Sequence, residues 1–170
     1  MRLAIAVSLI AISAACSSGG GTDTSTTRRS QSTTSSTLSA NEQVLSAYRG
    51  FWDAYLAAAD PMDPLSTRLA EHATGSELET VRKAFVARKS GGEVIRGTLD
   101  LAPRVVSVVG ESATVRDCYL DNTGIYDAAT GARKDTATGV RHLITASLVR
   151  EGTAWKVSEL KKESDGCTAA

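Results

Sequence analysis

The sequence lacks an excess of charge of either sign. Its 170 residues hold 19 lysines and arginines against 19 aspartates and glutamates, so the formal net charge at pH 7 is zero. Proteins that bind nucleic acid usually carry a surplus of positive charge, because neutralising the phosphates releases counterions. We therefore expect no nucleic-acid partner.

Motifs of common catalytic and cofactor sites are also missing. The sequence contains no glycine-rich phosphate loop, no nucleophile elbow and no His-Glu-x-x-His stretch. It has two histidines, and His72 lies near the predicted end of a helix, where the helix dipole favours it. The sequence thus predicts no cofactor and no metal site.

Long hydrophobic runs are scarce, and the one at the start of the chain is short. Arg2 precedes an apolar run from Leu3 to Ile12, and small residues follow up to Cys16. A helix needs about 20 apolar residues to cross the hydrocarbon core of a bilayer. Residues 1–15 are therefore predicted to be a secretory signal peptide.

The end of this signal, "ISAAC" from Ile12 to Cys16, resembles a bacterial lipobox. The resemblance implies cleavage after Ala15, lipidation of Cys16 and anchoring in the cell membrane on its extracytoplasmic face. Two acyl chains give stable anchoring, which one chain does not. The commonest lipobox has leucine where this chain has Ser13, so a plain secretory signal that leaves an ordinary cysteine is the alternative.

Residues 16–40 consist almost entirely of serine, threonine and glycine. They show no apolar periodicity, so they have nothing to bury that would offset the entropy of ordering. We expect a disordered tether here, followed by a folded domain over residues 41–170.

The folded part is predicted to begin with an aromatic-rich helix. Ser39 and Glu42 have the Ser-x-x-Glu spacing of a capping box. The apolar residues that follow recur at steps of 3, 4 and 1, which places them on one helix face. They are Val44, Leu45, Tyr48, Phe51, Trp52, Tyr55 and Leu56.

Two more helices are expected before Gly92, where the spacing of the apolar residues changes from a helical to a strand pattern. "DPMDP" from Asp60 to Pro64 ends the first helix, because proline cannot continue it. A short helix is predicted from Leu65 to about His72, and a third over residues 76–89. The third repeats the capping spacing at Ser76 and Glu79, and it carries Leu78, Val81, Phe85 and Val86 on one side.

From Gly92 onward the pattern favours strands. Five stretches are rich in β-branched residues and separated by turn signals: "EVIRGTLDL", "RVVSVVG", "ATVRDCYLDN", "GVRHLITASLVR" and "TAWKVSELKKE". "YDAATGARKDTATG" reads as a longer polar loop. Short connections imply antiparallel pairing, so the sequence predicts an α+β fold with N-terminal helices packed on a curved antiparallel sheet.

This order of elements, with the aromatic first helix and the closing "REGTAWKVSELK", resembles the nuclear transport factor 2-like, or cystatin-like, superfamily of cone-shaped domains over residues 41–163. The complete chain looks like small actinobacterial lipoproteins. The resemblance implies a domain that often holds a small pocket and often forms homodimers through its open sheet face.

The cysteine count predicts one disulfide. With Cys16 lipidated, Cys118 and Cys167 remain as a pair in an oxidising compartment. Their bridge would close a loop of about 50 residues and stabilise the domain by about 4 kcal/mol in the loop-entropy treatment. Two free thiols are the alternative.

Enzymes of the superfamily, such as ketosteroid isomerases and polyketide cyclases, place Asp, Tyr or His inside the cone. Here Asp117, Tyr119 and Asp121 alternate onto one face of a predicted strand. His142 lies on another predicted strand, on the same side as Ile144 and Leu148. An acid and an imidazole that face one cavity can transfer protons. Solvated turn aspartates and a histidine at the rim of the core explain the same pattern.

The residues Trp52, Tyr55, Tyr119, His142 and Trp155 are the candidates for lining an apolar pocket. As ordinary core residues they need no further explanation. We predict a non-enzymatic, membrane-anchored module that binds a small apolar ligand or an envelope protein. The alternative is a small isomerase-like or cyclase-like enzyme that uses a pocket Asp/His pair.

Overall fold

The first helix begins where the capping spacing predicts. The computed structural model describes residues 38–137 and 139–168, and its helix α1 spans Ala40–Ala59. Ser39 Oγ accepts a hydrogen bond from Glu42 N, and Ser39 N donates to the Glu42 carboxylate at 2.7 Å, which confirms the capping box. The predicted signal peptide (residues 1–15), the lipidation at Cys16 and nearly all of the tether lie outside the described residues.

The other two helices differ in detail from the prediction. Helix α2 spans Thr67–His72, and the side chain of Ser66 caps it, so Leu65 precedes the helix. Helix α3 spans Gly75–Ser90 and has Thr74 at its N-cap position without a side-chain cap. The predicted second capping box is therefore wrong. Val86, which was expected on the apolar side, is 54% exposed.

Two antiparallel sheets follow the helices. The larger one has the order β2-β4-β6-β7, and β3 pairs with the remainder of the β4 edge that β2 leaves free. The smaller sheet pairs β1 with β5. The strands are β1 (Glu93–Arg96), β2 (Leu99–Asp100), β3 (Pro103–Val109), β4 (Ser112–Asp121), β5 (Gly124–Asp127), β6 (Val140–Glu151) and β7 (Ala154–Asp165).

The first predicted strand, "EVIRGTLDL", is in fact two strands with different partners. Gly97 has φ 130° and separates β1 from β2, and a Cβ at this position would lie 2.4 Å from the carbonyl oxygen of Asn122. The chain can therefore approach the β4–β5 connection closely only because residue 97 is glycine. Strand β5 includes Tyr126 and Asp127, which the sequence pattern had assigned to a loop.

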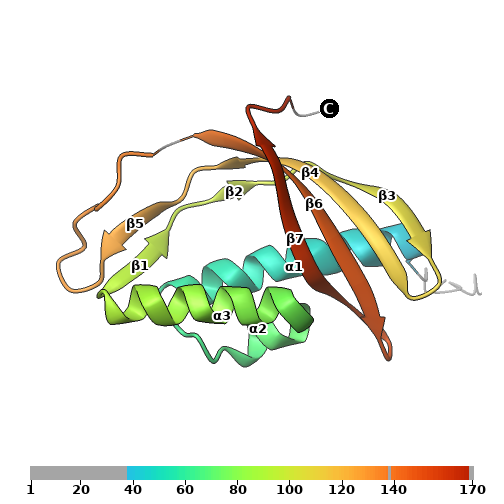
Figure 1. Ribbon diagram of the computed structural model, residues 1–170, viewed down its shortest axis with the longest axis horizontal. Coiled ribbons are helices and arrows are strands. Elements are labelled where there is room, and N and C mark those ends of the chain that lie inside the picture. Colours follow the sequence, from blue (N-terminus) through green and yellow to red (C-terminus); the bar gives the residue numbers. More distant parts are fainter. Residues whose placement is uncertain (1–37, 138, 169–170) are drawn as a thin grey trace, which may run out of the picture. The chain divides into compact units, whose positions relative to one another are not determined.

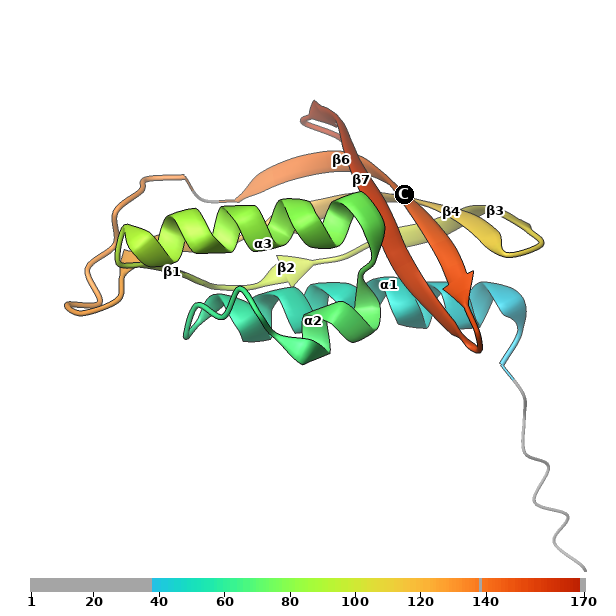
Figure 2. The same ribbon diagram turned by 60° about the horizontal axis from the view of Figure 1, so that its bottom comes forward.

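The helices lie on one face of the curved larger sheet (Figures 1 and 2). Alternate residues of β4 point toward them: Ala113, Val115 and Asp117 are buried, whereas Thr114 and Arg116 lie on the opposite face. This arrangement confirms the predicted α+β fold, with helices packed on a curved antiparallel sheet. No helix in the described part of the chain is long and apolar enough to cross a membrane.

A disulfide fixes the end of the chain to the centre of the sheet. Cys118 of β4 is bonded to Cys167, with Cα atoms 5.9 Å apart and a sequence separation of 49. This confirms the predicted pairing.

Tight hairpins join β3 to β4 and β6 to β7. Their turns contain Gly110 (φ 58°) and Gly152 (φ 63°), and apart from each glycine and its chain neighbours no heavy atom of the described residues lies within 4 Å of a Cβ built there. The β3–β4 turn projects from the edge of the sheet in Figure 1.

Candidate functional site

Helix α1 presents a row of aromatic rings to the sheet. Tyr48, Phe51, Trp52 and Tyr55 lie on neighbouring turns of one helix face, because Phe51 and Trp52 are each three or four residues from Tyr48 and from Tyr55. The Trp52 ring centroid lies 5.1 Å from that of Phe51, 5.6 Å from that of Tyr55 and 5.3 Å from that of Tyr119 on β4. The rings form one continuous aromatic wall between helix and sheet.

A cavity of about 270 Å³ lies beside this wall. Its lining comes from α1, α3, β2, β4, β7 and the residues before β5. Besides Phe51 and aliphatic side chains, it includes Trp52, Tyr55, Glu77, Tyr119, Asp121 and Thr123. Thr80 and Ala84, on the exposed side of α3, also line it, so the cavity reaches the surface along this helix. We call it the aromatic cavity.

A second cavity of about 310 Å³ shares Tyr55, Asp121 and Thr123 with the aromatic cavity. Its lining also includes His142 and Arg88, together with residues of the β5–β6 loop. The structure thus brings four of the five predicted pocket residues, Trp52, Tyr55, Tyr119 and His142, into one region.

Trp155, the fifth predicted pocket residue, lies elsewhere. It is 5% exposed and lines a separate surface hollow with His72, between the β6–β7 turn and the N-terminal part of α1. The sequence pattern placed Trp155 correctly in a strand, but it could not show that this end of β7 is distant from the Tyr119 end of β4.

Of the predicted acids, Asp121 lies closest to His142. The His142 Nε2 and Asp121 Oδ2 atoms are 3.9 Å apart, beyond hydrogen-bond distance, and Asp121 Oδ1 accepts a hydrogen bond from Thr123 N at 2.8 Å. The His142 ring also packs on Tyr119, its partner across the β4–β6 ladder, with centroids 5.4 Å apart. Asp121 and His142 can form an ion pair when the imidazole is protonated.

Asp117 is buried and hydrogen-bonded within the core of the fold. It is 1% exposed, and it accepts hydrogen bonds from Tyr48 OH at 2.9 Å and from Ala102 N at 2.8 Å. Burial raises the pKa of the Asp117 carboxyl, although these two hydrogen bonds act in the opposite direction. Neither of the two cavities is lined by Asp117, so this residue is not positioned to act on a ligand there.

Glu77 is a lining residue that the sequence analysis missed. It is 8% exposed, and its Oε2 accepts a hydrogen bond from Leu160 N at 2.9 Å. Burial raises the pKa of its carboxyl above the ordinary value. One signal was available: Glu77 is four residues before Val81 and eight before Phe85, which places an acid on the apolar face of α3.

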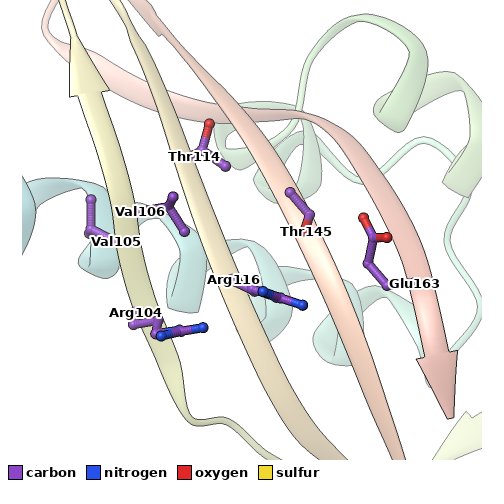
Figure 3. A pocket seen from close by; sticks show the side chains of 7 residues that line it. All are labelled: Arg104, Val105, Val106, Thr114, Arg116, Thr145 and Glu163. Atoms are coloured by element: carbon purple, nitrogen blue, oxygen red, sulfur yellow. The ribbon is translucent and has the colours of Figure 1, made fainter. Parts of the chain in front are cut away.

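The opposite face of the sheet carries a hollow of a different kind. It has a volume of about 580 Å³, and its lining includes Arg104, Arg116, Thr145 and Glu163 from four adjacent strands (Figure 3). Its lining contains no aromatic side chain. Among the described residues, no group of three or more His, Cys, Asp or Glu side chains is placed to hold a metal ion.

Comparison with known proteins gives the fold alone. No protein-family model matches the sequence, and no curated protein matches it. Among solved structures, the chain is similar to the crystal structure of the intermembrane space region of the chloroplast protein ARC6, with a TM-score of 0.56 and 16% sequence identity. The match covers 74% of this chain and 98% of that one. The two chains therefore share an arrangement of helices on a curved sheet.

Proposed function

We propose that this chain is an extracytoplasmic lipoprotein, anchored to the cell membrane through Cys16, whose folded domain binds a small apolar ligand in the aromatic cavity. Ligand binding is supported by the wall that Trp52, Tyr55 and Tyr119 form beside a cavity of about 270 Å³. Ligand sites are typically concave and lined by aromatic side chains with a few polar groups.

The size of the cavity limits the ligand. Its volume lies near the lower end of the range of about 300–1,000 Å³ that is usual for small-molecule sites. The ligand is therefore a compact small molecule. Its apolar part packs against the rings, while Glu77, Asp121 and Thr123 offer polar contacts.

A second candidate function, proton transfer by a small isomerase-like or cyclase-like enzyme, is favoured by one observation. Asp121 and His142 lie 3.9 Å apart, and Asp121 lines both cavities. If this function is correct, a His142→Ala variant binds the native ligand but does not complement a deletion strain. If the protein only binds its ligand, the same variant complements fully.

Obstruction of the cavity mouth tests ligand binding. Ala84 lines the cavity from the exposed side of α3, so we expect Ala84→Trp to fill the entrance without removing a core side chain. Ala87 is exposed on the same helix and does not line the cavity, so Ala87→Trp is the matched control. Mass spectrometry of small molecules that co-purify from native membranes should find a ligand with the wild type and with Ala87→Trp, but not with Ala84→Trp. Equal amounts from all three proteins would contradict the proposal.

Membrane fractionation tests the anchor. We expect Cys16→Ala to move the protein from the membrane fraction to the soluble extracytoplasmic fraction, because the diacylglycerol attachment is lost. Cys118→Ala with Cys167→Ala is the control, since these residues form the disulfide and leave residue 16 intact. Unchanged membrane association of Cys16→Ala would refute lipid anchoring at this position.

A further inference from the structure

Two acidic side chains and no basic side chain of the described residues line the aromatic cavity. Glu77 and Asp121 both contribute to the lining, which includes no lysine or arginine of the described residues. The neighbouring cavity is lined by the guanidinium of Arg88, which is paired with Glu93 at 3.2 Å. His142 lies on the side of Asp121 that faces this second cavity.

The aromatic wall has the same electrostatic preference as the two carboxylates. The faces of indole and phenol rings carry partial negative charge, and they attract a cation that comes within about 6 Å of the ring centroid. Trp52, Tyr55 and Tyr119 line the cavity together with Glu77 and Asp121, so a ligand in it lies beside both the aromatic and the acidic side chains.

Because Glu77 is buried, the absence of a compensating cation among the described residues of the cavity lining makes its ionised form unfavourable. A carboxylate that is 8% exposed has lost most of its hydration, and the hydrogen bond from Leu160 N replaces only part of it. Burial accordingly raises the pKa of Glu77. A cation in the cavity would supply the compensation that buried charges generally have.

We propose that the ligand of the aromatic cavity is a small organic cation, an ammonium group carried on a compact apolar body. This inference rests on the proposed function, which supplies the site and the apolar part of the ligand. The new element is the positive charge, held between the rings of Trp52, Tyr55 and Tyr119 and the carboxylates of Glu77 and Asp121.

A pair of isosteric probes separates charge from shape. Choline and 3,3-dimethylbutan-1-ol have the same outline, but only choline carries a positive charge. Ligand-detected NMR titration of the full chain in detergent should give an affinity for choline about ten-fold or more above that for the alcohol, since a desolvated cation over aromatic rings gains at least the ~1.4 kcal/mol that corresponds to ten-fold.

Variants that neutralise single carboxylates show which residues cause the preference for choline. We expect Glu77→Gln and Asp121→Asn each to weaken choline binding by about five- to ten-fold and to leave the binding of the alcohol unchanged. Both substitutions keep the oxygen that accepts the hydrogen bonds from Leu160 N and Thr123 N. Glu79→Gln is the matched control, because Glu79 is exposed on the same helix and does not line the cavity. Two variants on different elements keep the test decisive if one of them fails to fold.

Three results would overturn the inference. Equal affinities for the two probes would show an apolar pocket without preference for charge, and the proposed function would stand. A preference for choline that survives both Glu77→Gln and Asp121→Asn would place the cation elsewhere. Absence of choline binding would show that the cavity does not take an organic cation. The co-purification experiment with Ala84→Trp independently decides whether the cavity binds a ligand at all.

Discussion

At the scale of single residues, Glu77 occupies a position that is poor for stability. Its carboxyl lies on the apolar face of α3 with one hydrogen-bond donor, Leu160 N, at 2.9 Å. Such positions, where local stability is lost without an evident structural gain, are typical of functional sites. The other buried carboxyl, that of Asp117, differs, because Tyr48 and Ala102 satisfy both of its oxygens.

Replacement of Glu77 should therefore stabilise the free protein. The pKa of Glu77 is raised in the folded state, so the folded state retains its proton to higher pH than the unfolded state does. Stability is consequently lost as the pH rises from the unfolded pKa to the folded pKa. Glutamine does not titrate and keeps the acceptor oxygen. We expect Glu77→Gln to raise the free energy of unfolding by about 1 kcal/mol at pH 7, within the usual range of single substitutions.

Urea unfolding at pH 7 and pH 4 measures this effect. The gain should shrink at pH 4, where the wild-type carboxyl is protonated in the folded state. Glu79→Gln, on the exposed side of the same helix, should show little change at either pH. A loss of stability for Glu77→Gln at neutral pH would mean that the ionised carboxylate is well solvated.

At the scale of secondary-structure elements, α1 and α3 show how tertiary contacts override a local motif. Both helices have the Ser-x-x-Glu spacing, but only α1 has the capping box. At α3 the polar groups are used by the sheet: Thr74 Oγ1 donates to Glu151, Thr74 N donates to Val157 O, and Ser76 Oγ donates to Ser158 O. The helix consequently starts before Ser76.

The capping difference gives a prediction for α1. Loss of a serine N-cap typically costs about 1 kcal/mol. We expect Ser39→Ala to lower the free energy of unfolding by about that amount, because Glu42 N loses its acceptor. Glu79→Ala should change it by less than about 0.5 kcal/mol, since this exposed residue caps nothing. Thermal unfolding followed by circular dichroism distinguishes the two, and equal effects would show that the motif at α3 forms in solution.

The elements also show how far the sequence predicts the fold and the site. Apolar periodicity identifies the helices and the faces of the strands, because it reports which side of an element is buried. It does not report the partner of a strand, so the division of residues 93–101 at Gly97 and the existence of β5 were missed. For the same reason Glu77 and Tyr119 could not be placed together, because the packing of α3 near β4 and β7 is a tertiary feature.

At the scale of the whole folded unit, the disulfide joins the centre of the larger sheet to the residues after β7. Cys118 is in β4, and Cys167 follows the edge strand, 49 residues later. A cross-link over a loop of this length removes many conformations from the unfolded chain. The bridge therefore stabilises the unit without contributing to either cavity.

Removal of the bridge should lower stability and leave ligand binding intact. We expect a Cys118→Ser, Cys167→Ser variant to lose up to about 4 kcal/mol in the free energy of unfolding, the size given by the loop-entropy treatment. Urea unfolding with and without reductant measures this loss, and the wild type under reduction should approach the variant. Identical unfolding midpoints with and without reductant would show that the bridge contributes little.

The β3–β4 turn offers a position for a reporter group. Glu111 in this turn is exposed, and β4 runs from the next residue to Asp121 at the aromatic cavity, a length of about 30 Å at about 3.3 Å per residue. A fluorescent dye attached to this turn lies far enough from the cavity to leave it undisturbed. The same dye remains within the range of energy transfer to a labelled ligand. The efficiency of energy transfer along β4 would therefore report how much of the protein has ligand in the aromatic cavity.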